Sequence, residues 1–394
     1  MRQDSPVPLD PVGLLKELIR RRSITPVEDG VLDVLEAALV PLGFEVTRLV
    51  FEGDGSYTVG NLFATRPGTD PAARHLLFAG HTDVVPPGDA SLWRHDPFAA
   101  IEEDGRVIGR GATDMKSGIA AFVAALASAG PTAGRISLAI TNDEEADSIN
   151  GTEKLMAWAA AQGHRFDFAI IGEPSATARV GDSIKIGRRG SLNGVITIRG
   201  LQGHVAYPDR ARNPLPAAAA IVAALSGKLD EGTEAFPPSN LEFTSLDVGN
   251  DTTNVIPAQA VARFNVRYND RWTPETLEGA IRSSIDALDA AGRTIEFAVA
   301  GRPSRAFLCP PGDEVDLLID TIRDLTGEPP ELSTGGGTSD ARFIAGHCPV
   351  VECGLPGRSM HQANEEVAIA DLETLTELYA GFIARFTGGR GVDL

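Results

Sequence analysis

Four strand-like segments in this chain each lead into residues of the kind that bind metal ions. Three are short apolar runs, at 76–79, 136–140 and 168–171, and the fourth is the segment 350–353; helical patterns lie between them. Short, continuously apolar strands with helices between them are typical of a largely parallel sheet covered on both faces. The residues that follow these segments are His81, Asp83, Glu144, Glu145, Glu173 and His361. Because the carboxyl ends of parallel strands share one edge of a sheet, we expect these side chains to converge there.

A fifth motif, Gly109–Gly118, turns from a glycine-rich loop into an apolar helix and contains Asp114. Taken alone, Asp114 could equally cap that helix, and the acidic residues at 143–145 could equally form a solvated turn. Together, however, two imidazoles and several carboxylates form a donor set that suits zinc, with cobalt or manganese as substitutes. The joint pattern predicts a site for two Zn²⁺ ions, with Asp114 as the carboxylate that they share.

The remaining acidic residues could have different roles: metal binding, proton transfer and orientation of His81. Glu145 would bind a metal, which leaves Glu144 free to take a proton from the attacking water and deliver it to a leaving nitrogen. Asp83 lies two residues beyond His81 on an extended segment, so the two side chains point the same way. The Asp83 carboxylate could then accept a hydrogen bond from one ring nitrogen of His81 while the other nitrogen binds metal.

Composition excludes several classes of partner. The 394-residue chain has a formal net charge of -19, which repels nucleic acid and anionic membrane surfaces. The most apolar stretch, 118–130, is too short to span a bilayer, and the first residues lack a signal-peptide pattern. The three cysteines form no disulfide framework and suit a reducing compartment. We expect a cytoplasmic protein of two domains, with neither nucleic acid nor membrane as a partner.

The pattern of elements changes near residue 190. Residues 190–302 follow the order strand, helix, strand, strand, helix, strand, which is the βαββαβ order of a ferredoxin-like sandwich. The sequence predicts an α/β protein in which 1–189 and 303–394 build one catalytic domain around a mostly parallel sheet, with 190–302 inserted as a smaller domain. His204 lies in that insert, away from the sheet edge. Four other histidines are predicted to be structural or on the surface: His75, His95, His164 and His347.

Together these motifs resemble the zinc-dependent aminoacylase and carboxypeptidase family, and the resemblance spans nearly the whole chain. The metal motifs identify the broad family. Connecting phrases at 187–191, 202–208, 254–258 and 336–340 narrow it to members that hydrolyse N-succinyl-L,L-diaminopimelate. The resemblance implies a dizinc-peptidase-like catalytic domain and an inserted domain that forms a homodimer.

The resemblance also implies a role for each matching residue. Five residues would share two ions: His81, Asp114, Glu145, Glu173 and His361. Asp114 would bridge, His81 and Glu173 would complete one site, and Glu145 and His361 would complete the other. Glu144 would be the general acid/base, and Asp83 would be the acid that accepts a hydrogen bond from His81. The Asp114–Met115 peptide is expected to be cis.

Residues of the insert and its flanks match substrate-contacting positions of the family. The matching residues are Arg188, Ser191, Tyr207, Asn254, Arg267, Gly337 and Thr338. His204 of one subunit is expected to reach the partner's site and stabilise the oxyanion. Because the proposed substrate carries three carboxylates and the protein is acidic, local arginines must hold it, and Arg189 is a further candidate.

Two rival functions remain open. One is a sibling metallodeacylase, such as an acetylornithine deacetylase, or a metallocarboxypeptidase. The other is a non-catalytic binding protein on the same fold, which would be expected to lose the proton-transfer acid, yet Glu144 is present.

Overall fold

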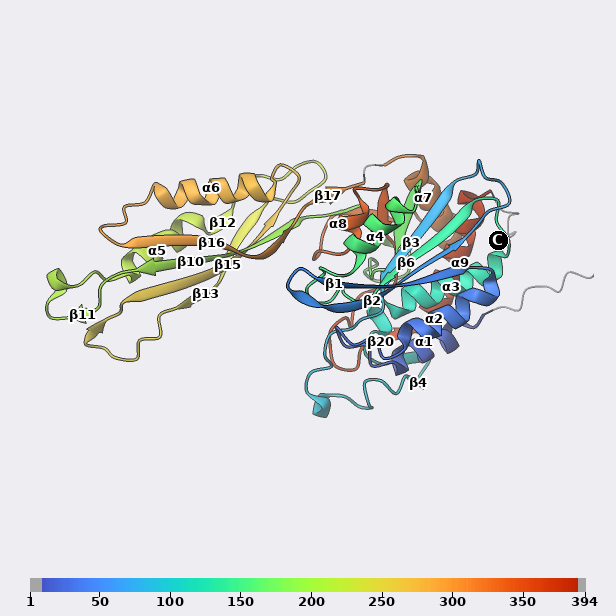
Figure 1. Cartoon of the computed structure of the whole chain (residues 1–394), viewed down its shortest axis with the longest axis horizontal. Helices are drawn as coiled ribbons and strands as arrows, with labels where there is room; N and C mark the ends of the chain where they lie inside the picture. Colours follow the sequence, from blue (N-terminus) through green and yellow to red (C-terminus); the bar gives the residue numbers. More distant parts are fainter. Residues whose placement is uncertain (1–8, 310, 389–394) are drawn as a thin grey trace, which may run out of the picture. The chain divides into compact units, whose positions relative to one another are not determined.

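The computed structural model describes residues 9–309 and 311–388. The chain forms two compact units (Figure 1). The first takes its described residues from Met1–Ile186, Cys309–Ser333 and Ser339–Leu394, and the second is Gly187–Leu308 with Thr334–Thr338. The second unit therefore contains residues 190–302 and short segments on either side of them.

The first unit is built on an eight-stranded sheet in the order β1-β2-β6-β3-β7-β19-β8-β18. The strands are β1 (Glu45–Gly53), β2 (Ser56–Arg66), β3 (His75–His81), β6 (Arg135–Thr141), β7 (Phe168–Ile171), β8 (Ser183–Lys185), β18 (Glu331–Ser333) and β19 (Val350–Glu352). The four predicted strands are β6, β3, β7 and β19, and they are parallel neighbours at the centre. The sheet is mixed, because β1 and β2 form an antiparallel hairpin that pairs antiparallel with β6.

Helices cover this central sheet. They are α1 (Pro11–Arg20), α2 (Val31–Leu39), α3 (Ser117–Ala129), α4 (Thr152–Ala161), α7 (Asp313–Thr326), α8 (Ala341–Ile344) and α9 (Ile369–Phe386). Every residue of β3 is buried, as expected for a strand with a helix layer on each face. In α3 every residue from Ser117 to Ala127 is buried, because α3 contacts β3, α1 and α9. The rings of Phe78 and Phe122 stack 4.1 Å apart between β3 and α3.

A small sheet, β20-β5-β4, lies in the same unit. Its strands are β4 (Ile101–Glu103), β5 (Arg106–Ile108) and β20 (Glu366–Ala368). The antiparallel pairing of β5 with β20 joins the segment just before Gly109 to the segment just after His361. These two segments carry the predicted ligands Asp114 and His361.

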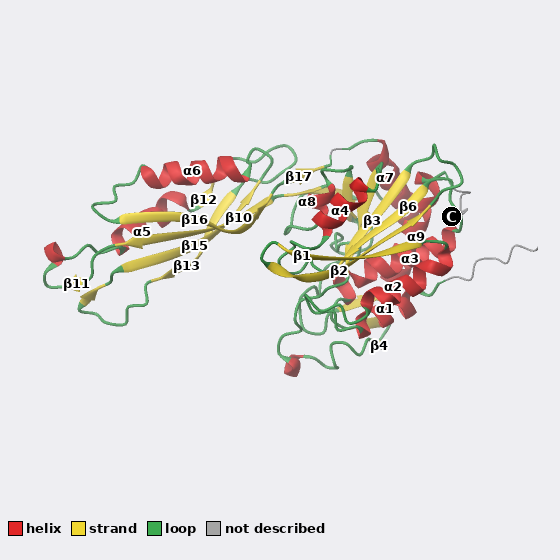
Figure 2. Ribbon diagram, viewed as in Figure 1, coloured by secondary structure: helices red, strands yellow, loops and turns green. Residues whose placement is uncertain are grey.

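The second unit is a sheet with two helices on it (Figure 2). Its elements are β10 (Gly190–Arg199), α5 (Leu215–Leu225), β12 (Gly227–Lys228), β13 (Asn240–Asp247), β15 (Gln259–Tyr268), α6 (Pro274–Asp286) and β16 (Thr294–Ser304). The strand order β13-β15-β10-β16, antiparallel throughout, is that of a ferredoxin-like fold. Alternate residues of β10 and β15 are buried, and with α5 and α6 they form one apolar core.

Two short ribbons also belong to this unit. One pairs β11 (Gly203–His204) with β14 (Val255–Ile256), and the other pairs β9 (Gly187–Arg188) with β17 (Phe307–Leu308). Across both units, none of the helices in the described part of the chain is long and apolar enough to cross a membrane.

Candidate dinuclear metal site

Residues from four strand ends and one helix start meet in the first unit. His81 is the last residue of β3, Glu144 and Glu145 follow β6, and Glu173 follows β7. Asp114 lies in the helical turn Ala112–Lys116 that leads into α3. His361 lies on the loop after β19. The Asp114–Met115 peptide is cis, as expected from the sequence.

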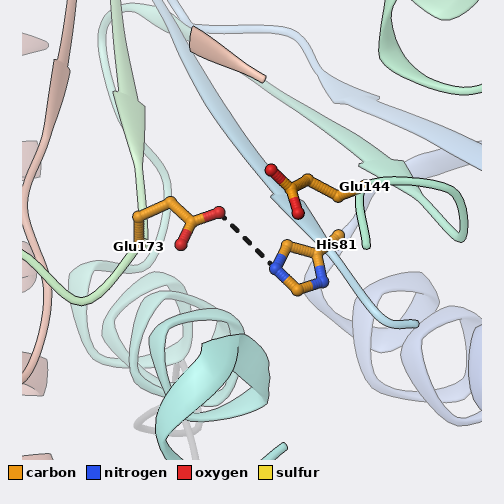
Figure 3. Close-up of side chains that lie close together, drawn as sticks. All are labelled: His81, Glu144 and Glu173. Atoms are coloured by element: carbon orange, nitrogen blue, oxygen red, sulfur yellow. Dashed lines mark ion pairs between the residues drawn. The ribbon is translucent and has the colours of Figure 1, made fainter. Parts of the chain in front are cut away.

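The Asp114 carboxylate faces both histidines. Its Oδ1 lies 3.1 Å from His81 Nε2, and its Oδ2 lies 3.3 Å from His361 Nε2. His81 Nε2 is also 3.5 Å from Glu173 Oε1, an ion pair visible in Figure 3. His361 Nε2 is 3.1 Å from Glu145 Oε1. The five predicted ligands therefore form one chain of contacts, with Asp114 in the middle.

Glu144 points toward His81 and Glu173 in the same view (Figure 3). Two clusters could each hold an ion: His81 with Glu144 and Glu173, and His81 with Asp114 and Glu145, in each of which the ligand atoms lie within 4.8 Å of one another. Glu144 is thus close enough to bind an ion as well as to move protons. This leaves its role as the free acid a prediction.

Asp83 contacts His81 differently from the sequence-based expectation. His81 Nδ1 is 2.9 Å from the main-chain oxygen of Asp83 and 3.6 Å from its carboxylate. A carbonyl oxygen can only accept, so Nδ1 carries the proton and Nε2 is left to face Asp114. The Asp83 carboxylate instead accepts the main-chain N–H of Glu144, at 3.1 Å, and of Glu145, at 3.0 Å. Asp83 therefore orients the turn that carries both glutamates.

Burial and like charge shift the pKa values of the acids. Burial, followed by the charge of Asp114, raises the pKa of Glu173 to about 7. Burial and then the charge of Glu173 raise the pKa of Glu144 well above its usual value. Burial also acts to raise the pKa of Asp114, but hydrogen bonds with His361 and His81 outweigh it and hold that pKa low. Several carboxyl groups therefore share a space in which they cannot all be charged without a nearby cation.

The pKa values of the two histidines are also raised, in their case by contact with the carboxylates. Hydrogen bonds with Asp114 and Glu145 raise the pKa of His361 to about 10. Burial opposes a charge on His81, yet its hydrogen bonds with Asp114 and Glu173 raise its pKa well above the usual value. These residues fit a pair of divalent cations, because the five predicted ligands are two imidazoles and three carboxylates, and the charge of three carboxylates exceeds what two imidazoles can balance.

The predicted substrate-contacting residues lie in the second unit. His204 and Asn254 are neighbours, because β11 pairs with β14 and Val205 N–H donates to Asn254 O at 3.0 Å. The His204 and Tyr207 rings are 5.7 Å apart, and both residues are exposed. Ser191 and Arg267 are directly opposite each other on β10 and β15.

Arg188 lies beside the other two predicted residues. Its Nη1 donates to Gly337 O at 3.3 Å, close to Thr338. The predicted substrate residues therefore form separate small groups within the second unit: one around His204, one at Ser191 and Arg267, and one around Arg188.

Two residues of the first unit were not singled out by the sequence reasoning. Arg110 and Glu365 are buried and form an ion pair with Nη1 and Oε2 2.6 Å apart. The sequence offered one signal for them: Arg110 lies four residues before Asp114, and Glu365 lies four residues after His361. Asp143 was also grouped with the acidic motif, but it accepts the Tyr57 hydroxyl and the main-chain N–H groups of 148–150, so its contacts are structural.

Comparison with known proteins agrees with this geometry. The model of Peptidase family M20/M25/M40 matches residues 77–385. A succinyl-diaminopimelate desuccinylase of Rhodopseudomonas palustris (strain BisB18) is 51% identical over 389 residues, covering 96% of this chain and 98% of that protein. Among solved structures, the M20 family metallo-carboxypeptidase Sso-CP2 of Sulfolobus solfataricus matches with a TM-score of 0.78 at 17% identity, covering 96% and 99% of the two chains.

A second solved structure shares the fold. The Bacillus subtilis YXEP protein, described as a dinuclear metal-binding peptidase of the M20 family, matches with a TM-score of 0.67 at 14% identity, over 96% of this chain and 98% of that chain. The fold and the cluster of imidazoles and carboxylates define a metallopeptidase-like α/β hydrolase. The chain belongs to Peptidase family M20/M25/M40. This confirms the resemblance and the fold class inferred from the sequence.

Proposed function

We propose that this protein hydrolyses N-succinyl-L,L-2,6-diaminopimelate to succinate and L,L-2,6-diaminopimelate, a step toward lysine and meso-diaminopimelate. The observation that carries the proposal is the likeness, at about half of all positions and over nearly the whole length, to proteins named succinyl-diaminopimelate desuccinylase. Membership of a peptidase family makes the chain a metal-dependent hydrolase of amide bonds. A cytoplasmic location fits such a biosynthetic step.

We propose two Zn²⁺ ions as the cofactor, with Co²⁺ or Mn²⁺ as substitutes. Asp114 would bridge them, with His81 and Glu173 on one side and Glu145 and His361 on the other. When bound, the ions polarise the amide carbonyl and lower the pKa of the attacking water.

Glu144 performs the proton transfers in this proposal. Burial and the charge of Glu173 raise its pKa, so its carboxyl group takes up a proton more readily than an ordinary glutamate does. It takes one proton from the water that attacks the succinyl carbonyl carbon. As the carbon–nitrogen bond breaks, it delivers that proton to the leaving amino nitrogen. Asp83 keeps Glu144 in place through the N–H bonds described above.

Arginines of the second unit would hold the substrate carboxylates. Arg267 Nη1 is buried and has no hydrogen-bond partner within the described residues. The charge of Arg189 adds to burial in lowering the pKa of Arg267, so a second guanidinium lies near it. A carboxylate would satisfy this donor and balance the charge, which supports the assignment of Arg267, with Arg188 and Arg189, to substrate binding.

We also propose a homodimer formed through the second unit. β12 pairs with only Asn240 and Leu241 of β13, so residues 242–247 form an open sheet edge in the described structure. The outer face of α5 is apolar and exposed at Ala219, Ala220, Ala223 and Ala224. An open edge and an apolar helix face are surfaces that soluble proteins usually cover.

The test of the function is a direct comparison of acyl substrates. Purified protein loaded with Zn²⁺ should turn over N-succinyl-L,L-diaminopimelate faster than N-acetylornithine, with kcat/KM as the measure. Faster turnover of N-acetylornithine would replace the proposed function with that of the sibling deacylase. No hydrolysis of either substrate, with both ions bound, would favour a binding protein.

A further inference from the structure

A buried ion pair joins the two segments that carry Asp114 and His361. Arg110 and Glu365 are 2% and 0% exposed, and neither has a part in the proposed ligand set or in the proton transfers. The Trp93 ring covers the guanidinium of Arg110 at 5.3 Å. A charged pair this deeply buried needs a full set of hydrogen bonds, so its partners show what it holds.

The Glu365 carboxylate holds the main chain around Asp114. Its Oε1 accepts the N–H of Thr113 at 2.8 Å and of Asp114 at 3.0 Å. Its Oε2 accepts the N–H of Gly111 at 3.1 Å, in addition to the Arg110 guanidinium. Two of these three N–H groups belong to the turn 112–116, so the carboxylate fixes the backbone from which the Asp114 side chain extends.

The Arg110 guanidinium holds the main chain around His361. Its Nη2 donates to His361 O at 3.4 Å and its Nη1 donates to Gln362 O at 3.3 Å. His361 has φ 62°, a left-handed conformation that non-glycine residues adopt rarely. Such a conformation persists only where the surroundings hold it, and the two donated hydrogen bonds flank it.

The same segments are joined through their main chains. Gly109 N–H donates to Glu365 O at 2.8 Å, and Thr113 Oγ1 donates to Glu366 O at 2.9 Å. The Arg110–Glu365 pair therefore connects the segment that contains Asp114 to the segment that contains His361. His81 and Glu173 have a different support, since they stand at the ends of the parallel strands β3 and β7.

We propose that Arg110 and Glu365 are positioning residues that set the placement of His361 relative to Asp114. Loss of Arg110, which holds His361, selectively weakens the ion on the side of His361 and Glu145 and spares the ion on the side of His81 and Glu173. Loss of Glu365, which holds the shared ligand Asp114, weakens both ions. This inference rests on the proposed two-ion site. A pair that served only to stabilise the fold would have no such selectivity.

Equilibrium dialysis of Zn²⁺ against metal-free protein tests this inference by counting bound ions without an activity assay. The wild type should bind two equivalents. Arg110→Lys keeps a positive charge beside Glu365 but cannot reach both carbonyl oxygens. In this variant one equivalent should keep its affinity while the second weakens by about tenfold or more, as expected when a group that orients a ligand is lost. In Glu365→Gln both equivalents should weaken, because both ions share Asp114.

Glu366→Gln is the matched control. Glu366 neighbours Glu365 in the chain, but its side chain makes exposed ion pairs with Arg94 and Arg106. This variant should bind both ions as the wild type does. Two ions bound normally by both Glu365→Gln and Arg110→Lys would overturn the inference. So would an equal fall in both affinities in Arg110→Lys together with a lower melting temperature of its metal-free form. A wild type that binds fewer than two equivalents would instead overturn the two-ion site itself.

Discussion

Glu144 and Glu145 are adjacent in the chain but face different partners. Both donate their main-chain N–H to Asp83. The Glu145 carboxylate lies against His361, whereas that of Glu144 points toward His81 and Glu173. One carboxylate shared between two tasks would have to leave its ion to move a proton. Two adjacent carboxylates on one turn avoid this conflict.

Replacement of Glu144 tests its role in proton transfer. Glu144→Ala should lower kcat by about 10²- to 10⁴-fold, the usual contribution of a general acid/base, with bound zinc near the wild-type amount. The control is Asp147→Ala, an exposed acid in the same loop, which should keep most activity. A loss of zinc together with activity would show that Glu144 is a ligand, which its place in the cluster with His81 and Glu173 also permits.

His75 gives the first unit a pH dependence that is separate from catalysis. Its Nδ1 is 2.7 Å from Arg165 O and its Nε2 is 2.8 Å from Ser137 Oγ. Burial lowers its pKa to about 4. The folded pKa is below the unfolded value of about 6.5, so folding disfavours the protonated ring. This stabilisation is complete above pH 6.5 and is lost as the pH falls toward 4.

The expected loss is at most about 3 kcal/mol, from roughly 1.4 kcal/mol for each pKa unit. Urea unfolding of metal-free protein at several pH values measures it, as the difference between the wild type and His75→Gln. That difference should change between pH 6.5 and 4. A flat difference for His75→Gln would contradict the assignment.

At the scale of elements, close contact between α3 and β7 places Glu173. A Cβ atom at Gly118, in the first turn of α3, would lie 2.2 Å from Gly172 O. A Cβ atom at Gly172 would lie within 3 Å of Phe78 and Met115. Glycine at both positions lets the helix approach the strand end, and Glu173 is the next residue.

Gly118→Ala should therefore push α3 away from the end of β7. We expect a loss of about 2–3 kcal/mol in the free energy of unfolding, typical of an overpacked core, and weaker zinc binding because Glu173 moves. Gly279→Ala is the matched control, since it lies in α6 and its added Cβ would meet nothing within 4 Å. It should stabilise by about 0.5–1 kcal/mol. Unchanged stability in Gly118→Ala would show that the contact relaxes easily.

Strand ends were the part of this fold that the sequence predicted best. The apolar runs in β3, β6 and β7 indicate strands that are buried on both faces, and β19 was predicted as a fourth strand, so the shared edge of these strands could be predicted as well. The hairpin β1–β2 was not predicted. Its alternation is weak, because most residues of β1 are only partly buried.

The contacts within the candidate site could be predicted only in part. Residue type and strand ends identified the acids and histidines, but not which atom each would contact. Arg110 and Glu365 are 255 positions apart in the chain. A contact between such distant residues cannot be predicted from a local sequence pattern. The contact of His81 with the main chain of Asp83, rather than with its carboxylate, is likewise set by backbone geometry.

At the scale of the whole molecule, the proposed dimer would let one subunit assist the other. Ala206 N–H donates to His204 Nδ1 at 3.0 Å, so in the neutral ring Nε2 carries the proton and can donate it to an oxyanion. Because His204 is exposed, a partner subunit or a substrate can reach it.

Mixed dimers test this assistance. His204→Ala and Glu144→Ala homodimers should each have little activity. If each site uses the partner's His204, mixing the subunits should restore one working site in each mixed dimer, and thus roughly a quarter of wild-type activity after random exchange of equal amounts. Without any recovery, His204 would act within its own subunit or have no role.

In the proposed site two cations share the Asp114 carboxylate. Anomalous diffraction at the zinc edge, from crystals loaded with Zn²⁺, locates the ions without an activity assay. We expect two peaks in the first unit, one beside His81 and Glu173 and one beside Glu145 and His361, with the Asp114 carboxylate between them. A single peak, or peaks that Asp114 does not contact, would contradict it.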